Sequence, residues 1–87
     1  NFTWNDAKRQ ANLKKHGLDF VDASRVFAGH TLTRPDTRFP YGEARFSTGV
    51  AGVEVVVIAH TETEDTIQVI SMRKAERHER EYYFASL

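Results

Sequence analysis

The 87-residue sequence contains no cysteine, only two prolines and no long hydrophobic run. Without cysteine, the chain cannot form disulfides, thiolate metal sites or cysteine nucleophiles. Its longest apolar run, residues 55–59, is far too short to cross a bilayer. The first residues also lack a basic segment followed by an apolar one. We therefore expect a cytoplasmic protein with no membrane association.

The sequence also lacks net charge, because 12 basic residues balance 12 acidic ones. No global field attracts nucleic acid, so any anion-binding site must be local. Eight of the basic residues are arginine, the side chain best suited to forked contacts with phosphate. A hydrophobic share of 40% and a charged share of 28% are typical of a folded protein. We expect one domain spanning residues 1–87.

The spacing of apolar residues predicts a mixed α+β fold. Helices are expected from Asn5 or Asp6 to about His16, with Gly17 as the stop, and from Asp19 to Gly29. Strands are expected over residues 2–4, 31–34, 43–50, 53–60 and 66–70, with a loop over residues 35–42. The predicted order is β-α-α-β-β-β-β-α, an antiparallel β-sheet meander packed with two N-terminal helices and a C-terminal helix.

The final helix is predicted to begin near Met72, with Ser71 as its N-cap. Arg73 would then lie in the first turn, where the helix dipole already favours an anion. At about 100° per residue, Arg73, Arg77 and Arg80 fall within a narrow arc of this helix. This row of arginines could bind the phosphodiester of a nucleic acid.

Arg45, from a neighbouring strand, could reach the same phosphate as Arg73, because positive donors stabilise the charge that develops during phosphoryl transfer. Glu43 lies two residues earlier on the strand and points the same way, so it could act as a base near that phosphate. A structural ion pair remains open for Glu43 and Arg45. Pairing of the arginine row with Glu76, Glu79 and Glu81 on a solvated helix face also remains open.

Histidine is the side chain whose pKa best suits proton transfer near neutrality, and the sequence contains four. His16 lies at a predicted helix C-terminus, where it could move protons or stabilise the helix end. His60, at the end of a central strand, is interpreted as a hydrogen-bonded structural residue. The histidines do not follow a metal-ligand spacing, and no glycine-rich phosphate loop is present, so we expect neither a metal nor a cofactor.

Three groups of residues resemble the BrnT toxins of bacterial type II toxin–antitoxin modules. The resemblance spans essentially the whole chain, and it departs from the family at Gln68 and Met72. The matching residues are Phe2, Trp4, Asn5, Ala11, Asn12, Leu13, Lys15, His16, Gly17, Leu18 and Phe20, then Glu43, Arg45, Phe46 and Gly49, and finally Ile70, Ser71, Arg73, Lys74 and Ala75.

The resemblance implies a RelE-like fold and ribonuclease activity. It also implies a BrnA-type antitoxin that binds the toxin and, as a complex, binds operator DNA through a ribbon-helix-helix domain. The hypothesis is a metal-independent endoribonuclease in which a 2′-hydroxyl attacks the adjacent phosphate. The candidate catalytic residues are Arg73, Arg45, Glu43 and His16, and the candidate RNA-binding residues are Lys15, Lys74, Arg77 and Arg80. The alternative hypothesis is a non-catalytic module whose basic helix face docks an acidic protein partner.

Overall fold

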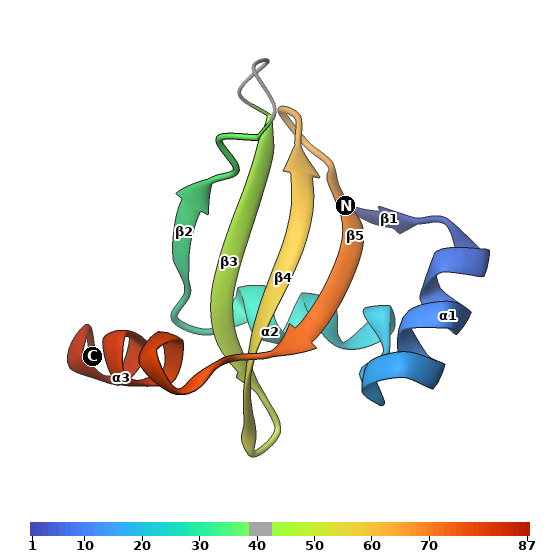
Figure 1. The fold of residues 1–87 in the computed structure, drawn as a ribbon. Coiled ribbons are helices and arrows are strands. Elements are labelled where there is room, and N and C mark those ends of the chain that lie inside the picture. Colours follow the sequence, from blue (N-terminus) through green and yellow to red (C-terminus); the bar gives the residue numbers. More distant parts are fainter. Residues whose placement is uncertain (39–42) are drawn as a thin grey trace.

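The computed structural model describes residues 1–38 and 43–87, and five strands in these residues form one sheet (Figure 1). The strands are β1 (Phe2–Trp4), β2 (Leu32–Pro35), β3 (Ala44–Ala51), β4 (Glu54–Glu62) and β5 (Ile67–Lys74). Their order across the sheet is β1-β5-β4-β3-β2. The mixed α+β class is confirmed. The loop predicted over residues 35–42 includes residues 39–42, which lie outside the described residues.

Strand β1 departs from the predicted antiparallel meander, because it pairs with β5 in parallel, while the other neighbouring strands are antiparallel. The 62 residues from Asn5 to Thr66 separate β1 from β5, so no hairpin constrains their relative direction. Beyond the end of β1, the buried side chain of Asn12, from the first helix, bonds to the same edge of β5. Its Oδ1 accepts a hydrogen bond from the Met72 amide at 3.1 Å, and its Nδ2 donates to the Leu18 carbonyl at 3.0 Å. Asn12 therefore attaches the first helix to β5.

The first helix, α1 (Asp6–His16), begins and ends as its sequence predicts. The Asn5 side chain accepts a hydrogen bond from the Lys8 amide at 3.1 Å, and Gly17 closes the helix with a φ of 69°. The second helix differs from the prediction at its start. Asp19 caps a single 3-10 turn, η1 (Phe20–Asp22), and α2 (Ala23–Ala28) follows. In the described residues, no helix is long and apolar enough to cross a membrane.

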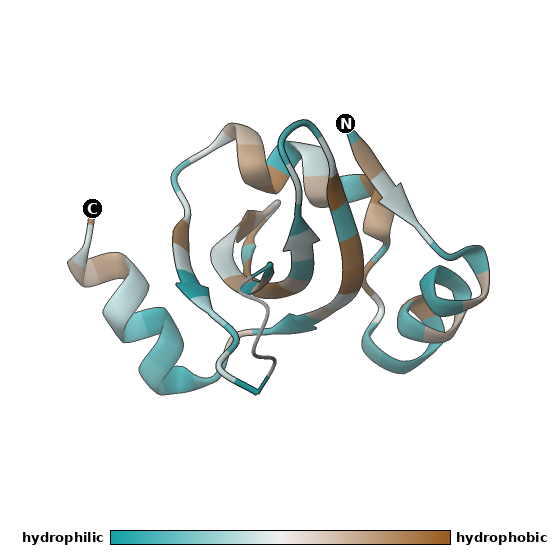
Figure 2. Ribbon diagram, turned by 90° about the horizontal axis from the view of Figure 1, so that it is seen from above, coloured by the Kyte–Doolittle hydropathy of each residue, from teal (hydrophilic) through white to brown (hydrophobic). Residues whose placement is uncertain are grey.

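The two faces of the sheet are covered to different extents. Helix α2 and the η1 turn lie on one face, and Figure 2 shows α1 and α3 (Arg77–Ala85) on the two flanks of the curved sheet. The core on the α2 side contains Phe20, Ala23, Val26, Val56, Ile58, Val69 and Met72. A smaller cluster on the other side contains Val55, Val57, Ala75 and Tyr83. Residues 55–58 of β4 are buried throughout, as expected for a strand covered on both faces.

The predicted start of the last helix is wrong. Ser71 lies within β5, and α3 begins only after Glu76, which forms a capping box with Glu79. Met72 and Arg73 pair with Ile58 and Val57 of β4. Hydrogen bonds between these strands satisfy the backbone N–H and C=O groups that would bond within the chain in a helix. The pairing partner in β4 therefore outweighs the capping preference of Ser71. Arg73 consequently lies on a strand that precedes the helix, and not in the first helical turn.

Candidate functional site

The face of the sheet opposite α2, here called the open face, carries the candidate site. A Cβ added to Gly49 would lie 2.7 Å from the Val26 side chain, so Gly49 faces α2, and Arg45, four residues earlier on β3, shares that covered face. Phe46 alternates with these residues and faces the open side. Arg73 pairs with Val57, which pairs with Thr48 of β3, so Arg73 also faces the open side.

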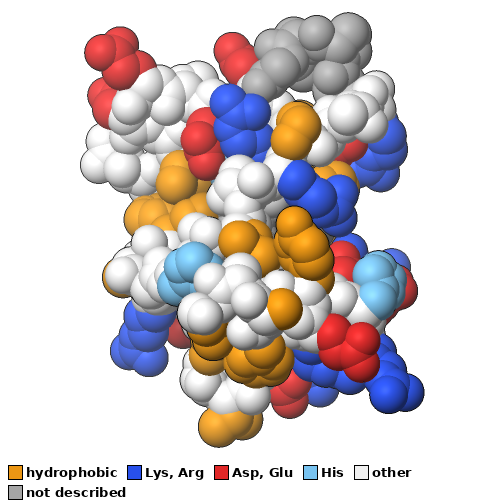
Figure 3. Space-filling view, turned by 90° about the vertical axis from the view of Figure 1, so that its left-hand side faces the viewer, with side chains coloured by type: hydrophobic (Ala, Val, Ile, Leu, Met, Phe, Trp, Pro, Cys, Tyr) orange, Lys and Arg blue, Asp and Glu red, His pale blue; other side chains and the backbone are white. Residues whose placement is uncertain are grey.

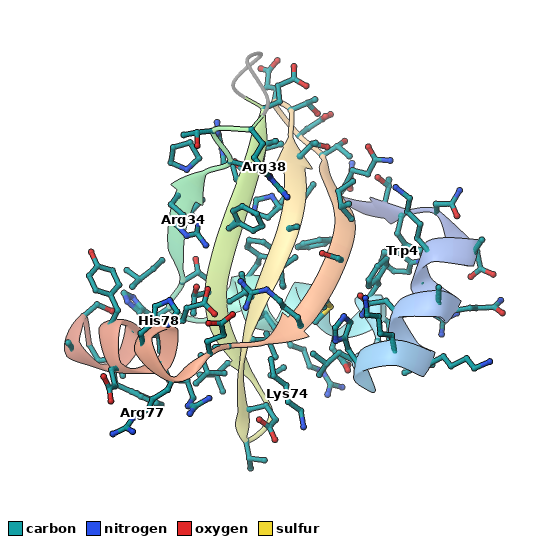
Figure 4. The ribbon with its side chains drawn as sticks, viewed as in Figure 1. Trp4, Arg34, Arg38, Lys74, Arg77 and His78 are labelled. Atoms are coloured by element: carbon teal, nitrogen blue, oxygen red, sulfur yellow. The ribbon has the colours of Figure 1, made fainter. Side chains whose placement is uncertain are left out.

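Two arginines lie over the Phe46 ring on the open face. The guanidinium carbon of Arg34 is 4.5 Å from the ring centroid, and that of Arg38 is 5.4 Å away. Arg34 comes from β2, directly across from Phe46 in the register. Arg38 makes a forked pair with Asp36, at 2.8 and 2.6 Å, and this pair lowers the pKa of the Asp36 carboxyl. Figure 4 shows Arg34 and Arg38 beside β2 and β3 on the side facing the viewer.

Arg73 forms the third cationic group of the open face. It donates to both carboxylate oxygens of Glu79, from Nη1 at 2.7 Å and from Nη2 at 2.9 Å. Glu79 also accepts from the Glu76 amide at 2.8 Å, and Arg34 approaches it to 3.7 Å. The hydrogen bonds from Arg73 are the largest cause that lowers the pKa of Glu79, to about 2. Glu79 is therefore ionised at neutral pH and is a poor proton acceptor.

Two clefts lie beside these arginines. The larger, of about 630 Å³, is lined by residues from α3, β2 and β3, including Arg34, Glu79 and Tyr82. The smaller, of about 280 Å³, is lined by residues that include Lys8, Arg38 and Thr61. Figure 3 shows hydrophobic side chains gathered on the side of the molecule formed by β2 and α3, with basic side chains around them. The open face thus combines exposed positive charge with apolar surface, the combination that RNA backbones and bases require.

Over residues 4–79, the sequence matches the family described as ribonuclease toxin, BrnT, of type II toxin-antitoxin systems. The chain belongs to the BrnT family. The resemblance drawn from its motifs is confirmed, and with it membership of a family of ribonuclease toxins. A search of curated proteins found no match. In the part of the chain that the structure describes, no group of three or more histidine, aspartate or glutamate side chains could hold a metal ion.

The structure does not bring all the candidate catalytic residues of this BrnT chain together. The prediction that Arg45 and Arg73 hold one phosphate is wrong in its geometry, because the two side chains leave opposite faces of the sheet. Arg45 pairs across the strands with His60 and lies 3.4 Å from the Glu62 carboxylate. Glu43 is exposed just before β3, and its carbonyl accepts from the Glu62 amide at 3.0 Å.

The predicted row of arginines on one helix is also wrong, because Arg73 lies on β5 while Arg77 and Arg80 lie on α3. Arg77 donates to Glu81 at 3.1 Å on an exposed helix surface, and Figure 4 shows it pointing away from the sheet. Arg80 donates to the Ala75 carbonyl at 2.8 Å. The alternative stated in the sequence analysis, that these arginines pair with glutamates, is therefore correct for Arg73, which binds Glu79, and for Arg77, which binds Glu81.

The remaining candidates lie at two other positions. Lys15 is exposed and His16 is half-buried in the last turn of α1, which packs against β5. Lys74 lies at the end of β5, 3.8 Å from the Glu54 carboxylate. The roles of these three residues in RNA binding or proton transfer stay predictions.

Sequence reasoning missed Arg34 and Arg38. Arg34 follows Leu32 by two residues on a short strand, so alternation alone places both on one face, and this signal could have marked it. Arg38 lies beyond β2, and its position over Phe46 depends on the path of the chain after Pro35. No local pattern indicates that position.

His60 has the structural surroundings that its position predicts. Its Nε2 lies 2.8 Å from the Ser47 hydroxyl, which is 2.7 Å from the Thr33 hydroxyl, and His60 is only 1% exposed. Burial lowers the pKa of His60, while Glu62 partly opposes this shift. Ser47 is completely buried and His60 nearly so, which supports the structural interpretation of this pair.

Proposed function

We propose that this BrnT chain is a metal-independent endoribonuclease that binds RNA on the open face of its sheet and inhibits translation and growth. The observation that carries the proposal is the set of three guanidinium groups, from Arg34, Arg38 and Arg73, on a face that α2 leaves uncovered. A curved sheet with one open, basic face between flanking helices also supports the RelE-like relationship.

In the proposed reaction, the ribose 2′-hydroxyl attacks the adjacent phosphorus and the 5′-oxygen of the next nucleotide leaves. The hydroxyl loses its proton to a base, and the leaving oxygen gains one. Arg73 stabilises the negative charge on the phosphoryl oxygens, as oriented donors do in other oxyanion sites. Fixed positive charge from arginine supplies the stabilisation for which other nucleases use a metal ion. His16 and Glu43 are the candidates for proton transfer.

The backbone on either side of the cut is proposed to contact further cations. Lys15 and Lys74 extend the basic surface from α1 and from the end of β5, and Arg77 and Arg80 extend it along α3. Contacts of this kind position RNA without reading its sequence. We therefore expect each of them to affect affinity more than the chemical step.

The proposed partner is a BrnA-type antitoxin that covers the basic surface and, as a complex with the toxin, binds operator DNA. Helix α3 exposes Tyr82 by 74% and Phe84 by 55%, so it offers apolar contacts beside the arginines. An antitoxin segment with acidic and apolar residues would match both features. Co-expression with such an antitoxin should give a stable complex that no longer cleaves RNA.

The experiment that tests the proposed activity is cleavage of total RNA by the purified chain, with and without a chelator. We expect cleavage in both, and no cleavage of an oligonucleotide with 2′-deoxyribose at the scissile position. Loss of activity in the chelator would contradict metal independence. Intact RNA in both samples, together with tight binding of an acidic partner, would favour the alternative of a non-catalytic binding module.

A further inference from the structure

The cleft between α3 and strands β2 and β3 has the size and chemistry of a nucleotide site. Its volume of about 630 Å³ lies within the range of roughly 300–1,000 Å³ that is common for small-molecule sites. Its lining includes Leu32 and Thr48 from the sheet and Tyr82 and His78 from the helix. Arg34 and Glu79 also line it, so the cleft opens beside the cationic groups of the open face.

Glu79 fixes the orientation of Arg73. It binds the two terminal nitrogens of the guanidinium, Nη1 and Nη2, and so occupies the end of the fork. Nη1 uses its second hydrogen on the Lys74 carbonyl, at 3.3 Å. Within the described residues, the Arg73 Nε makes no hydrogen bond. The side of the fork formed by Nε and Nη2 therefore remains for a phosphate, which a guanidinium binds through two parallel N–H groups.

Glu79 also draws Arg34 toward Arg73. The Nη2 atoms of both arginines approach the same oxygen, Oε2, at 3.7 Å for Arg34 and 2.9 Å for Arg73. Two guanidinium groups repel each other unless a negative charge lies between them, and the Glu79 side chain is only 12% exposed at that position. One carboxylate that lines the cleft thus binds Arg73 from β5 and forms an ion pair with Arg34 from β2.

Tyr82 supplies an aromatic surface in the same cleft. It is 74% exposed, so its ring is accessible to a ligand in the cleft. Unpaired RNA bases stack on exposed aromatic rings, and each stack contributes about 1–3 kcal/mol to binding.

We propose that this cleft is a nucleotide subsite, in which Arg34 and Arg73, both positioned by Glu79, clamp one RNA phosphate while the adjoining base stacks on Tyr82. The inference rests on the proposed function and names Glu79 as a positioning residue and Tyr82 as a binding residue. Glu79 does not itself contact the phosphate.

The test measures binding of a fluorescent RNA oligonucleotide with 2′-O-methyl groups throughout, which cannot be cut by 2′-hydroxyl attack. Arg34→Ala, Glu79→Gln and Tyr82→Ala should each weaken binding about tenfold. Glutamine can still accept from the Glu76 amide, so the helix cap is kept while the charge is lost. Tyr82→Phe keeps the aromatic ring and should recover most of the affinity that Tyr82→Ala loses. The matched controls are Glu81→Gln on the same helix and Arg25→Ala on α2, which should both change affinity less than twofold.

A positioning role predicts that Glu79→Gln loses its effect in a chain that already lacks both Arg34 and Arg73, where it should change affinity less than twofold. An equal effect in both backgrounds would mean that Glu79 acts only on folding. Unchanged RNA affinity in Arg34→Ala and Tyr82→Ala would overturn the subsite, and loss of antitoxin binding in those variants would make the cleft a protein interface. If the analogue binds as predicted but unmodified RNA is not cut by the wild-type chain, the subsite stands and the proposed ribonuclease function fails.

Discussion

The two faces of the sheet differ in whether their polar side chains are buried or exposed to solvent. On the covered face, the polar side chains Ser47 and His60 are buried and linked by a hydrogen bond, and apolar packing from α2 surrounds them. On the open face, Arg34, Arg38 and Arg73 keep contact with solvent and are held in place by Asp36 and Glu79. The covered face therefore supplies most of the stability of the fold, and the open face holds charges that contribute less to it. Substitutions should separate the two roles.

The largest effect on stability is expected from the covered face. Phe20 is completely buried against the α2 side of the sheet. Phe20→Ala should lower the free energy of unfolding by about 3–5 kcal/mol, since it removes a buried aromatic ring and leaves a cavity. Urea denaturation measures the change. Val53→Ala, at a residue that is 99% exposed, is the control and should have almost no effect. Equal changes in the two variants would contradict the assigned core.

The next largest effect is expected from Glu79 at acidic pH. Its pKa falls from 4.5 to about 2 on folding, so the unfolded chain binds a proton more readily than the folded one. Its contribution to stability is complete above about pH 4.5 and is lost as the pH falls toward 2. Because solvent screens this partly exposed ion pair, the loss should be about 1–2 kcal/mol. Thermal unfolding across this range measures the loss. Glu79→Gln should flatten that part of the profile, whereas Glu81→Gln should leave it unchanged.

A third pH effect is expected from the covered face. Burial keeps the pKa of His60 below its ordinary value of 6.5, so the folded state disfavours the charged imidazole. The contribution of His60 to the free energy of unfolding should be fully present above about pH 6.5. It should fall as the pH drops below this value, because the unfolded chain then gains the proton more readily than the folded one. His60→Gln should remove this dependence. His78→Gln, at an exposed histidine on α3, should keep it. Persistence of the dependence in His60→Gln would assign it to another group.

The smallest effect is expected from the outer surface of α3. Arg77 and Glu81 are exposed and form a pair one helical turn apart. Such pairs contribute about 0.3–0.5 kcal/mol to stability at most. Arg77→Ala should therefore leave the unfolding midpoint nearly unchanged, while high salt should reduce even this small difference. A loss above about 1 kcal/mol would mean that Arg77 has a structural partner on the sheet.

Features set by neighbouring residues could be predicted from the sequence. Asn5 and Gly17 bound α1 through hydrogen bonds within a few residues, and the apolar run in β4 indicates a strand buried on both faces. Features that depend on distant partners could not be predicted. The sequence predicted that the last helix starts near Met72, but β5 pairs with β4 through Lys74 and the helix starts only after Glu76.

The candidate site was predicted in part for the same reason. The sequence motifs indicated the family, which is confirmed. They also marked Arg73 as a candidate residue, and its role stays a prediction. The separation of Arg45 from Arg73 follows from strand register, which places the two side chains on opposite faces. Arg34 and Arg38 join the site through their contacts with Phe46, which only the folded sheet creates.

Cleavage of RNA on the open face is tested by comparing the variants Arg73→Ala and Arg25→Ala. Both remove one arginine, from opposite sides of the sheet. We predict that Arg73→Ala lowers the rate of RNA cleavage by on the order of 100-fold, with Arg73→Lys recovering only part of it because the fork is lost. Arg73→Ala should lower the free energy of unfolding by only about 1 kcal/mol, since the pair with Glu79 is partly exposed. Arg25→Ala should cleave RNA at the wild-type rate. Equal rates for the two folded variants would contradict cleavage on the open face.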